Sequence, residues 1–196
     1  MNFFKMQVPA PIAVTERLVI RRLTMDDVAD MYTYASKEEV TRYLLWSPHP
    51  DKEFTYRYIK YILSEYKKGN FFDYAIEYRK DNRMIGTVGF TELDRLNNKC
   101  EIGYVINPDY AQKGIATEAL WAMIGYAFEH LGMERVEAHY MIDNNASRRV
   151  MEKCCMKSEG VFRSFLRVKD IYRDVGVYSI LKREYYARKY EVERGL

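Results

Sequence analysis

The sequence predicts an α+β fold in one domain, because strand-like and helix-like segments follow one another along a chain of 196 residues. Across residues 100–106, apolar and other side chains alternate with the period of two that marks a half-buried strand. Across residues 116–131, apolar residues recur at helical spacing, and Gly132 follows as a C-cap. Residues 71–78 and 84–93 predict a hairpin around a polar turn.

The N-terminal third predicts a strand and two helices. After a lead-in that ends near Thr15, residues 17–23 are expected to form the first strand. Thr24 and Asp26 are candidate caps for a helix through Tyr32. An aromatic loop stiffened by proline follows at residues 45–50. A second helix is then expected over residues 51–68, ended by Gly69.

The C-terminal half predicts a strand at residues 135–141, a short helix at 145–155 and two strands at 161–168 and 171–181. The residues after Lys182 are expected to form a charged tail with some helix propensity. No repeat or interdomain linker interrupts this order. We therefore expect one domain over residues 1–196, with its core at about 15–185.

Composition excludes several classes of protein. With 48% hydrophobic and 30% charged residues, the chain has the composition of a soluble globular protein. A net charge of +3 is too small to argue for a nucleic-acid partner. The longest apolar run is far shorter than the roughly 18–20 residues of a membrane span, and no signal peptide is recognisable. Three cysteines make no disulfide framework, and the histidines lack metal-ligand spacing. A cytoplasmic protein without a metal is expected.

The turn between the strand at 100–106 and the following helix is a candidate anion site. Pro108 stops the strand, and residues 112–117 read Gln-Lys-Gly-Ile-Ala-Thr. The first turn of a helix presents backbone N–H groups and the positive end of the helix dipole. The small residues Gly114 and Ala116 would let a phosphate approach the backbone. The turn therefore predicts a phosphate-bearing cofactor.

This turn resembles the pyrophosphate loop of the GNAT superfamily of N-acetyltransferases, Gln/Arg-x-x-Gly-x-Gly/Ala. Gly114 and Ala116 match that pattern, and Ala111 departs from it. With Glu101-Ile-Gly-Tyr before it, the extension Gly-Ile-Ala-Thr-Glu-Ala resembles the branch that acetylates the N-terminal amines of ribosomal proteins. The resemblance implies α/β/α layers around a mixed, mostly antiparallel sheet of about seven strands, splayed between the fourth and fifth strands, with helices on both faces. It also implies acetyl-CoA as the cofactor.

In that fold the pantetheine arm pairs with the backbone of the fourth strand, as a peptide adds to a sheet edge. Asn144 either binds the pantetheine amide or only caps its own helix. The cofactor-binding residues that the resemblance implies are Tyr104, Val105 and Ile106 on the strand, Gln112, Lys113, Gly114, Ile115, Ala116 and Thr117 at the turn, and Asn144.

A second segment, residues 143–153, resembles the Asn-x-x-Ser/Ala helix and the Glu-Lys ending of the family. The pattern breaks at Cys155 and Met156, where Gly-Phe is usual. Many relatives carry a Tyr that protonates the leaving thiolate, but this chain has Met151 there. Ser147 is then the candidate proton donor, or it bonds back to its own helix.

Glu101 is the candidate base that removes the proton of the acceptor ammonium, directly or through water. The alternative is an ion pair on the sheet surface. The backbone N–H of Val105 would polarise the thioester carbonyl. Cys100, Cys154 and Cys155 are expected to be buried small apolar residues, not nucleophiles.

Trp46 and His49 in the aromatic loop and Tyr178 near the last strand are candidate substrate-binding residues, although packing also explains Tyr178. The sequence therefore favours an acetyl-CoA-dependent N-acetyltransferase, monomeric or homodimeric, that acts directly on a primary amine. The acceptor is a protein N-terminus, such as that of a ribosomal protein, or a small amine, amino acid or antibiotic. A non-catalytic acyl-CoA-binding regulatory module stays open as a different class.

Overall fold

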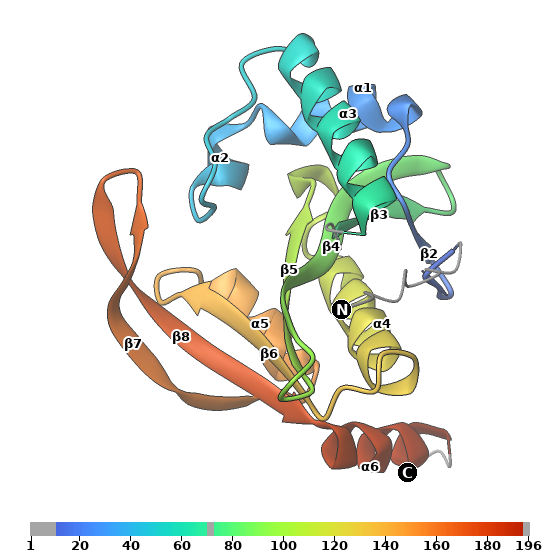
Figure 1. Cartoon of the computed structure of the whole chain (residues 1–196), viewed down its shortest axis with the longest axis vertical. Coiled ribbons are helices and arrows are strands. Elements are labelled where there is room, and N and C mark those ends of the chain that lie inside the picture. Colours follow the sequence, from blue (N-terminus) through green and yellow to red (C-terminus); the bar gives the residue numbers. More distant parts are fainter. Residues whose placement is uncertain (1–10, 70–72, 194–196) are drawn as a thin grey trace. The chain divides into compact units, whose positions relative to one another are not determined.

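The computed structural model describes residues 11–69 and 73–193 (Figure 1). The chain falls into two compact units. The first unit comprises residues up to Gly89 together with Tyr104–Ala119, and the second comprises Phe90–Gly103 together with the chain from Leu120 onward. Two long strands and one helix run from one unit into the other. Phe71 and Phe72, at the start of an expected strand, lie outside the described residues.

The strands form a mixed, mostly antiparallel sheet, which confirms the predicted α+β fold. Their hydrogen-bonded order is β1-β2-β3-β4-β5-β6-β8-β7. The bounds are β1 Ala13–Val14, β2 Leu18–Arg21, β3 Asp73–Tyr78, β4 Arg83–Asp94, β5 Lys99–Ile106, β6 Arg135–Met141, β7 Lys157–Val168 and β8 Ile171–Leu181. The two-residue β1 was not predicted. The parallel pairing of β5 with β6 joins Lys99–Glu101 to Arg135–Glu137, and β5 continues beyond it to Ile106.

The helices of the first unit begin and end at the residues that local chemistry favours. The short 3-10 helix η1 (Met25–Asp27) leads into α1 (Val28–Ala35). Thr24 caps η1, but its capping box is completed by Asp27, not by the predicted Asp26. Two further helices follow, the short α2 (Glu38–Thr41), which the sequence did not predict, and α3 (Lys52–Lys68).

Helix α3 ends where Gly69 takes a φ of +77°, the left-handed conformation that glycine adopts without strain. At its start, the Asp51 carboxylate accepts a hydrogen bond from Phe54 N at 2.6 Å. These two residues explain why the predicted limits of this helix are confirmed.

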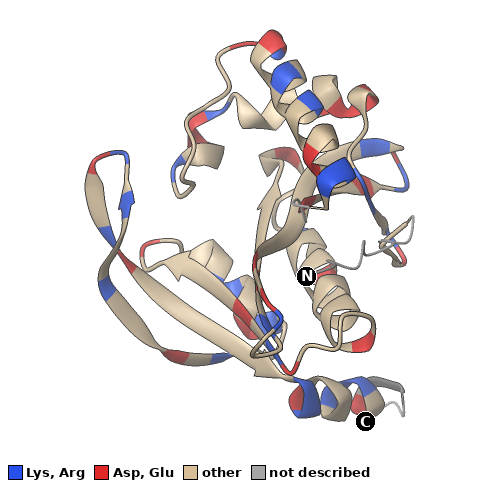
Figure 2. Cartoon of the chain, in the orientation of Figure 1, with Lys and Arg blue, Asp and Glu red and all other residues tan. Residues whose placement is uncertain are grey.

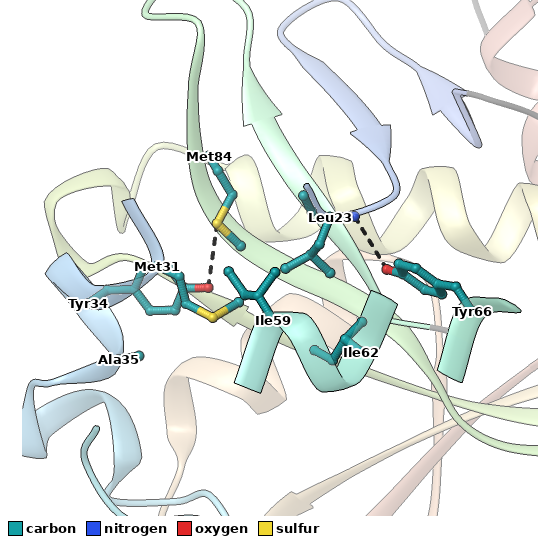
Figure 3. Packing of buried hydrophobic residues seen from close by; sticks show 9 residues of the cluster. Leu23, Met31, Tyr34, Ala35, Ile59, Ile62, Tyr66 and Met84 are labelled. Atoms are coloured by element: carbon teal, nitrogen blue, oxygen red, sulfur yellow. Dashed lines mark hydrogen bonds between the residues drawn. The ribbon is translucent and has the colours of Figure 1, made fainter. Parts of the chain in front are cut away.

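The core of the first unit packs α1 and α3 against β3 and β4 (Figure 3). Ile59 and Ile62 of α3 are completely buried beside Leu23, and Tyr34 of α1 points its hydroxyl at the sulfur of Met84, 3.9 Å away. Val105 of β5 packs against this cluster. The cluster therefore supports the strand on which the cofactor residues were predicted.

The second unit contains most of α4 (Ile115–Glu129), α5 (Asn145–Lys153) and α6 (Lys182–Glu193). Helix α6 forms where the sequence predicted a charged tail with some helix propensity. Its Tyr185 is 4% exposed, with its ring centroid 5.1 Å from that of Trp121 and 5.4 Å from that of Phe128. One buried aromatic residue therefore anchors a helix whose other residues are mostly polar.

Basic residues (Lys, Arg) and acidic residues (Asp, Glu) alternate in short stretches along the chain of both units (Figure 2). None of the helices that the structure describes is long and apolar enough to span a bilayer.

Candidate active site

The predicted phosphate turn is an exposed loop with two left-handed residues. Gln112 has a φ of +60° and Gly114 a φ of +76°, and residues 111–114 are all exposed. Helix α4 begins directly after Gly114, whose carbonyl accepts a hydrogen bond from Glu118 N at 3.0 Å. Left-handed residues in a loop before a helix N-terminus form a concave backbone surface of the kind that binds anions. The turn thus fits a pyrophosphate group, with residues 112–117 as the backbone that would hold it.

An ion pair between Arg17 and Glu118 fixes the base of this turn. Arg17 donates from Nη1 to the carbonyl oxygen of Lys113 at 2.8 Å. Its Nε and Nη2 each lie 2.6 Å from Glu118 Oε2. Thr15 Oγ1 and Arg17 N donate to Glu118 Oε1 at 2.5 and 3.0 Å. Thr15 and Arg17, just before β2, therefore hold both the loop at residues 111–114 and the first turn of α4.

The electrostatics of the pair favour an ionised Glu118. Partial burial of the carboxylate opposes ionisation, but the hydrogen bonds from Thr15 and Arg17 outweigh it and lower the pKa of Glu118. The Arg17 side chain remains 37% exposed. It adds a fixed positive charge beside the turn, with Nη2 3.5 Å from the point that a Cβ on Gly114 would occupy.

The Lys113 side chain turns back toward the preceding 3-10 helix η2 (Pro108–Tyr110). Its Nζ donates to the Asp109 carbonyl at 2.9 Å and lies 5.2 Å from the centroid of the Tyr110 ring. In this conformation Lys113 offers the turn its backbone and not its ammonium group.

The end of β5 runs very close to β4. A Cβ on Gly86 would lie 2.2 Å from the carbonyl oxygen of Val105, so only glycine fits there. Asn107 N then donates to the carbonyl of Ile85 at 2.7 Å. Tyr104, Val105 and Ile106 are each half-buried.

In the second unit, Asn144 caps α5. Its Oδ1 accepts a hydrogen bond from Ser147 N at 3.2 Å, which is the capping alternative of the sequence argument. Ser147 is half-buried, and Met151 and Cys154 behind it are buried. Ser147 therefore lies on the same side of α5 as two buried residues. The neighbouring Arg148 also has its Nε buried.

The turn after α5 keeps its shape without glycine. Cys155 takes a φ of +57° where the family pattern has Gly. It is exposed, so the expectation that it is buried is wrong. Cys100 and Cys154 are buried as expected, and burial raises the pKa of each thiol to about 12.

Glu101 lies beside a histidine that the sequence argument did not connect with it. Glu101 Oε2 is 3.1 Å from His139 Nδ1, and the two side chains are 22% and 16% exposed. On the same strand as His139, Glu137 accepts a hydrogen bond from Arg135 Nε at 2.7 Å. Arg135 in turn makes two hydrogen bonds to the carboxylate of Glu159. Glu101 therefore belongs to a chain of polar groups across β5, β6 and β7.

The predicted substrate-binding residues lie in two separate environments. His49 is 5% exposed; its Nδ1 is 2.9 Å from Thr55 Oγ1, and its ring packs 5.3 Å from that of Trp46. Burial lowers the pKa of His49, which favours the neutral imidazole. Tyr178 of β8 is 7% exposed and donates from its hydroxyl to Glu152 Oε1 at 3.1 Å. His49 and Tyr178 both make packing contacts.

Two features beside the candidate site were not predicted from the sequence. They are the Arg17–Glu118 ion pair and the position of His139 next to Glu101. Glu118 stands in the quoted motif, but its partner lies 101 residues earlier in the chain. His139 lies two residues beyond Glu137, whose register partner is Glu101. A predicted parallel pairing of these two strands was the one signal that could have brought His139 next to Glu101.

A model of the acetyltransferase (GNAT) domain matches residues 17–157, which is more than half of the chain. The chain belongs to the GNAT acetyltransferase family. It is 33% identical over 172 residues to the uncharacterised N-acetyltransferase YoaA of Bacillus subtilis, covering 88% of this chain and 97% of YoaA. It is 32% identical over 182 residues to a protein of the same organism named "Putative ribosomal N-acetyltransferase YdaF", covering 90% and 97% of the two chains.

Solved structures of GNAT acetyltransferases share the fold. A family member from Bacillus anthracis superposes with a TM-score of 0.77 at 29% identity, covering 87% of this chain and 98% of the other. The microcin C7 self-immunity acetyltransferase MccE, solved with acetyl-CoA and AMP, superposes with a TM-score of 0.78 at 19% identity, covering 88% and 97%. GNAT acetyltransferases take their acetyl group from acetyl-CoA.

Proposed function

We propose that this GNAT acetyltransferase transfers the acetyl group of acetyl-CoA directly to a primary amine, which is carried by the N-terminus of a protein acceptor. The exposed left-handed turn at residues 112–114, held by Arg17 at the N-terminus of α4, is the observation that carries the cofactor assignment. The pyrophosphate is assigned to the backbone of residues 112–117, and the pantetheine arm to the end of β5.

The bound cofactor supplies an acetyl thioester, whose carbonyl carbon is the electrophile. Glu101 takes a proton from the acceptor ammonium, because only the neutral amine has a lone pair for attack. The N–H of Val105 is assigned to the carbonyl oxygen, where negative charge develops. The Ser147 hydroxyl is assigned as the donor that protonates the departing sulfur, since Met151 carries no proton to give.

The name of one relative supports a protein N-terminus, rather than a small molecule, as the acceptor. The protein named as a ribosomal N-acetyltransferase is similar to this chain over 97% of its own length. Spermidine acetyltransferase of Vibrio cholerae is also similar, at 22% identity over 176 residues, so a small polyamine is the second candidate acceptor.

The cofactor assignment is tested by Gly114→Glu. The new carboxylate fills the turn and repels phosphate, so acetyl-CoA binding measured by calorimetry should fall below detection. Gly132→Glu is the matched control, because Gly132 follows the other end of α4 with a φ of +70° and nothing within 4 Å of an added Cβ. The backbone strain is similar in both variants. Equal affinity of the parent and Gly114→Glu for acetyl-CoA refutes the assignment.

The acceptor is tested by release of free CoA against a panel of peptides with free N-termini, the same peptides with acetylated N-termini, and small amines. Release only with free N-termini supports a protein acceptor, and release only with polyamines supports the second candidate. Tight binding of acetyl-CoA without release for any amine contradicts catalysis and favours the regulatory module.

A further inference from the structure

His139 Nδ1 lies 3.1 Å from Glu101 Oε2 in an ion-pair contact. An ionised carboxylate only accepts hydrogen bonds, so in a hydrogen bond across this contact His139 Nδ1 would be the donor and Glu101 Oε2 the acceptor. This contact occupies one carboxylate oxygen. The other oxygen, Oε1, is left to receive a proton.

The imidazole ring is held in this orientation by its surroundings. Phe162 and Phe165 of β7 meet it edge-on, each with a centroid distance of 6.4 Å and interplanar angles of 89° and 83°. His139 Nε2 is buried without a hydrogen-bond partner, and its nearest carboxylate oxygen, Glu137 Oε2, is 3.6 Å away. Packing, rather than a second hydrogen bond, therefore sets the ring plane.

One carboxylate oxygen of Glu137 is engaged by the Arg135 guanidinium. Arg135 Nε holds Glu137 Oε1 at 2.7 Å, and its guanidinium is itself fixed by Glu159 and by Ser179 Oγ at 3.1 Å. Glu137 thus binds Arg135, while His139 Nδ1 contacts Glu101. No group of His, Cys, Asp and Glu among the described residues has the arrangement of a metal site, so His139 is not explained as a ligand.

We infer that His139 is a positioning residue for the base. By donating Nδ1–H to Oε2, it fixes the Glu101 carboxylate with Oε1 as the atom that takes the proton of the acceptor ammonium. In that step the ammonium N–H bond breaks, the proton moves to Oε1, and the nitrogen keeps the electron pair for attack. The inference rests on the proposed function, in which Glu101 is the base.

The test compares His139→Asn with His139→Leu. These side chains have the same branching, but only Asn carries an N–H donor on Cγ, where the histidine Nδ1 stands. We expect His139→Asn to keep kcat within about threefold of the parent, and His139→Leu to lose about 10- to 100-fold, as for other groups that orient a catalytic ligand. Acceptor KM and the Kd of acetyl-CoA should not change. His130→Leu, at an exposed histidine of the same unit, is the control.

Several results overturn the inference. These are an equal loss of kcat in the Asn and Leu variants, parental kcat in His139→Leu, and parental kcat in Glu101→Gln. If the parent protein shows no turnover with any acceptor, the proposed function fails. The contact between His139 and Glu101 can then still be tested by NMR. The carboxyl carbon-13 resonance of Glu101, assigned by its loss in Glu101→Gln, should move in His139→Leu and stay near its parental position in His139→Asn. An unmoved resonance in His139→Leu refutes the contact.

Discussion

Replacing Glu118 by Gln should lower the free energy of unfolding and also reduce the affinity for acetyl-CoA. The carboxylate accepts hydrogen bonds from Thr15 Oγ1, Arg17 N and Arg17 Nε, and pairs with Arg17 Nη2. The amide of Gln keeps one acceptor oxygen but turns an N–H₂ group toward either Thr15 or the guanidinium. Arg17 then loses its ionic partner, and its side chain is no longer held in the position from which it donates to the Lys113 carbonyl.

The size of the effect follows from these contacts and their exposure. One hydrogen bond to a charged group contributes about 1.5–3 kcal/mol when well shielded. The Arg17 side chain is 37% exposed, so water recovers part of that energy, and exposed ion pairs contribute roughly 0–1 kcal/mol. We therefore expect a loss of about 1–2 kcal/mol in the free energy of unfolding. If the turn is held by Arg17, the Kd of acetyl-CoA should rise about tenfold, which corresponds to about 1.4 kcal/mol.

Urea unfolding measures the free energy of unfolding, and calorimetry measures the Kd of acetyl-CoA. The matched control is Glu129→Gln at the other end of α4, where Oε1 accepts hydrogen bonds from Tyr185 Oη at 2.5 Å and Lys189 Nζ at 2.7 Å. This control also removes one charge and an ion pair, but should leave acetyl-CoA binding unchanged. A Glu118→Gln protein with parental affinity would refute the reasoning, as would an equal loss of affinity in Glu129→Gln.

Two further predictions concern stability. Cys155→Gly should raise the free energy of unfolding by about 0.5–1 kcal/mol, since glycine takes the φ of +57° without strain, whereas Cys155→Ala should not; thermal unfolding checks both. Hydrogen bonds from Arg135 and Ser179 lower the pKa of Glu159 from 4.5 to about 2. The folded carboxylate thus adds stability above pH 4.5 that is lost as the pH falls toward 2, and urea midpoints measured across that range should depend less on pH in Glu159→Gln. A parental pH dependence in that variant would contradict this.

Much of the fold could be predicted from the sequence because its longest elements carry strong local signals. The predicted limits of β6 and β8 are confirmed, and α3 begins after its cap at Asp51 and ends at Gly69. For the charged tail the sequence predicted only some helix propensity, because its polar residues hide the one that anchors helix α6. Tyr185 becomes buried only against side chains from another helix.

The candidate site was predictable where its residues are neighbours in sequence. The turn around Gly114 and the Asn144 cap are local features, and the structure has both where the sequence placed them. Arg17 and His139 could not be found in this way, since each meets its partner from a distant segment: Arg17 contacts Glu118 on α4, and His139 reaches Glu101 through the pairing of β5 with β6. The burial of His49 depends on packing, because its ring lies against Phe54 and Tyr58 of the following helix α3.

The Arg17–Glu118 ion pair bears on how the protein is made. The first unit is discontinuous in sequence, because it takes in Tyr104–Ala119 only after the chain has passed through Phe90–Gly103. During synthesis, Arg17 leaves the ribosome 101 residues before its partner. A nascent chain that ends before Glu118 thus contains Arg17 without the carboxylate that it binds. Closing so long a loop is slow compared with forming local helices, so the phosphate turn should be among the last parts of this unit to acquire its final shape.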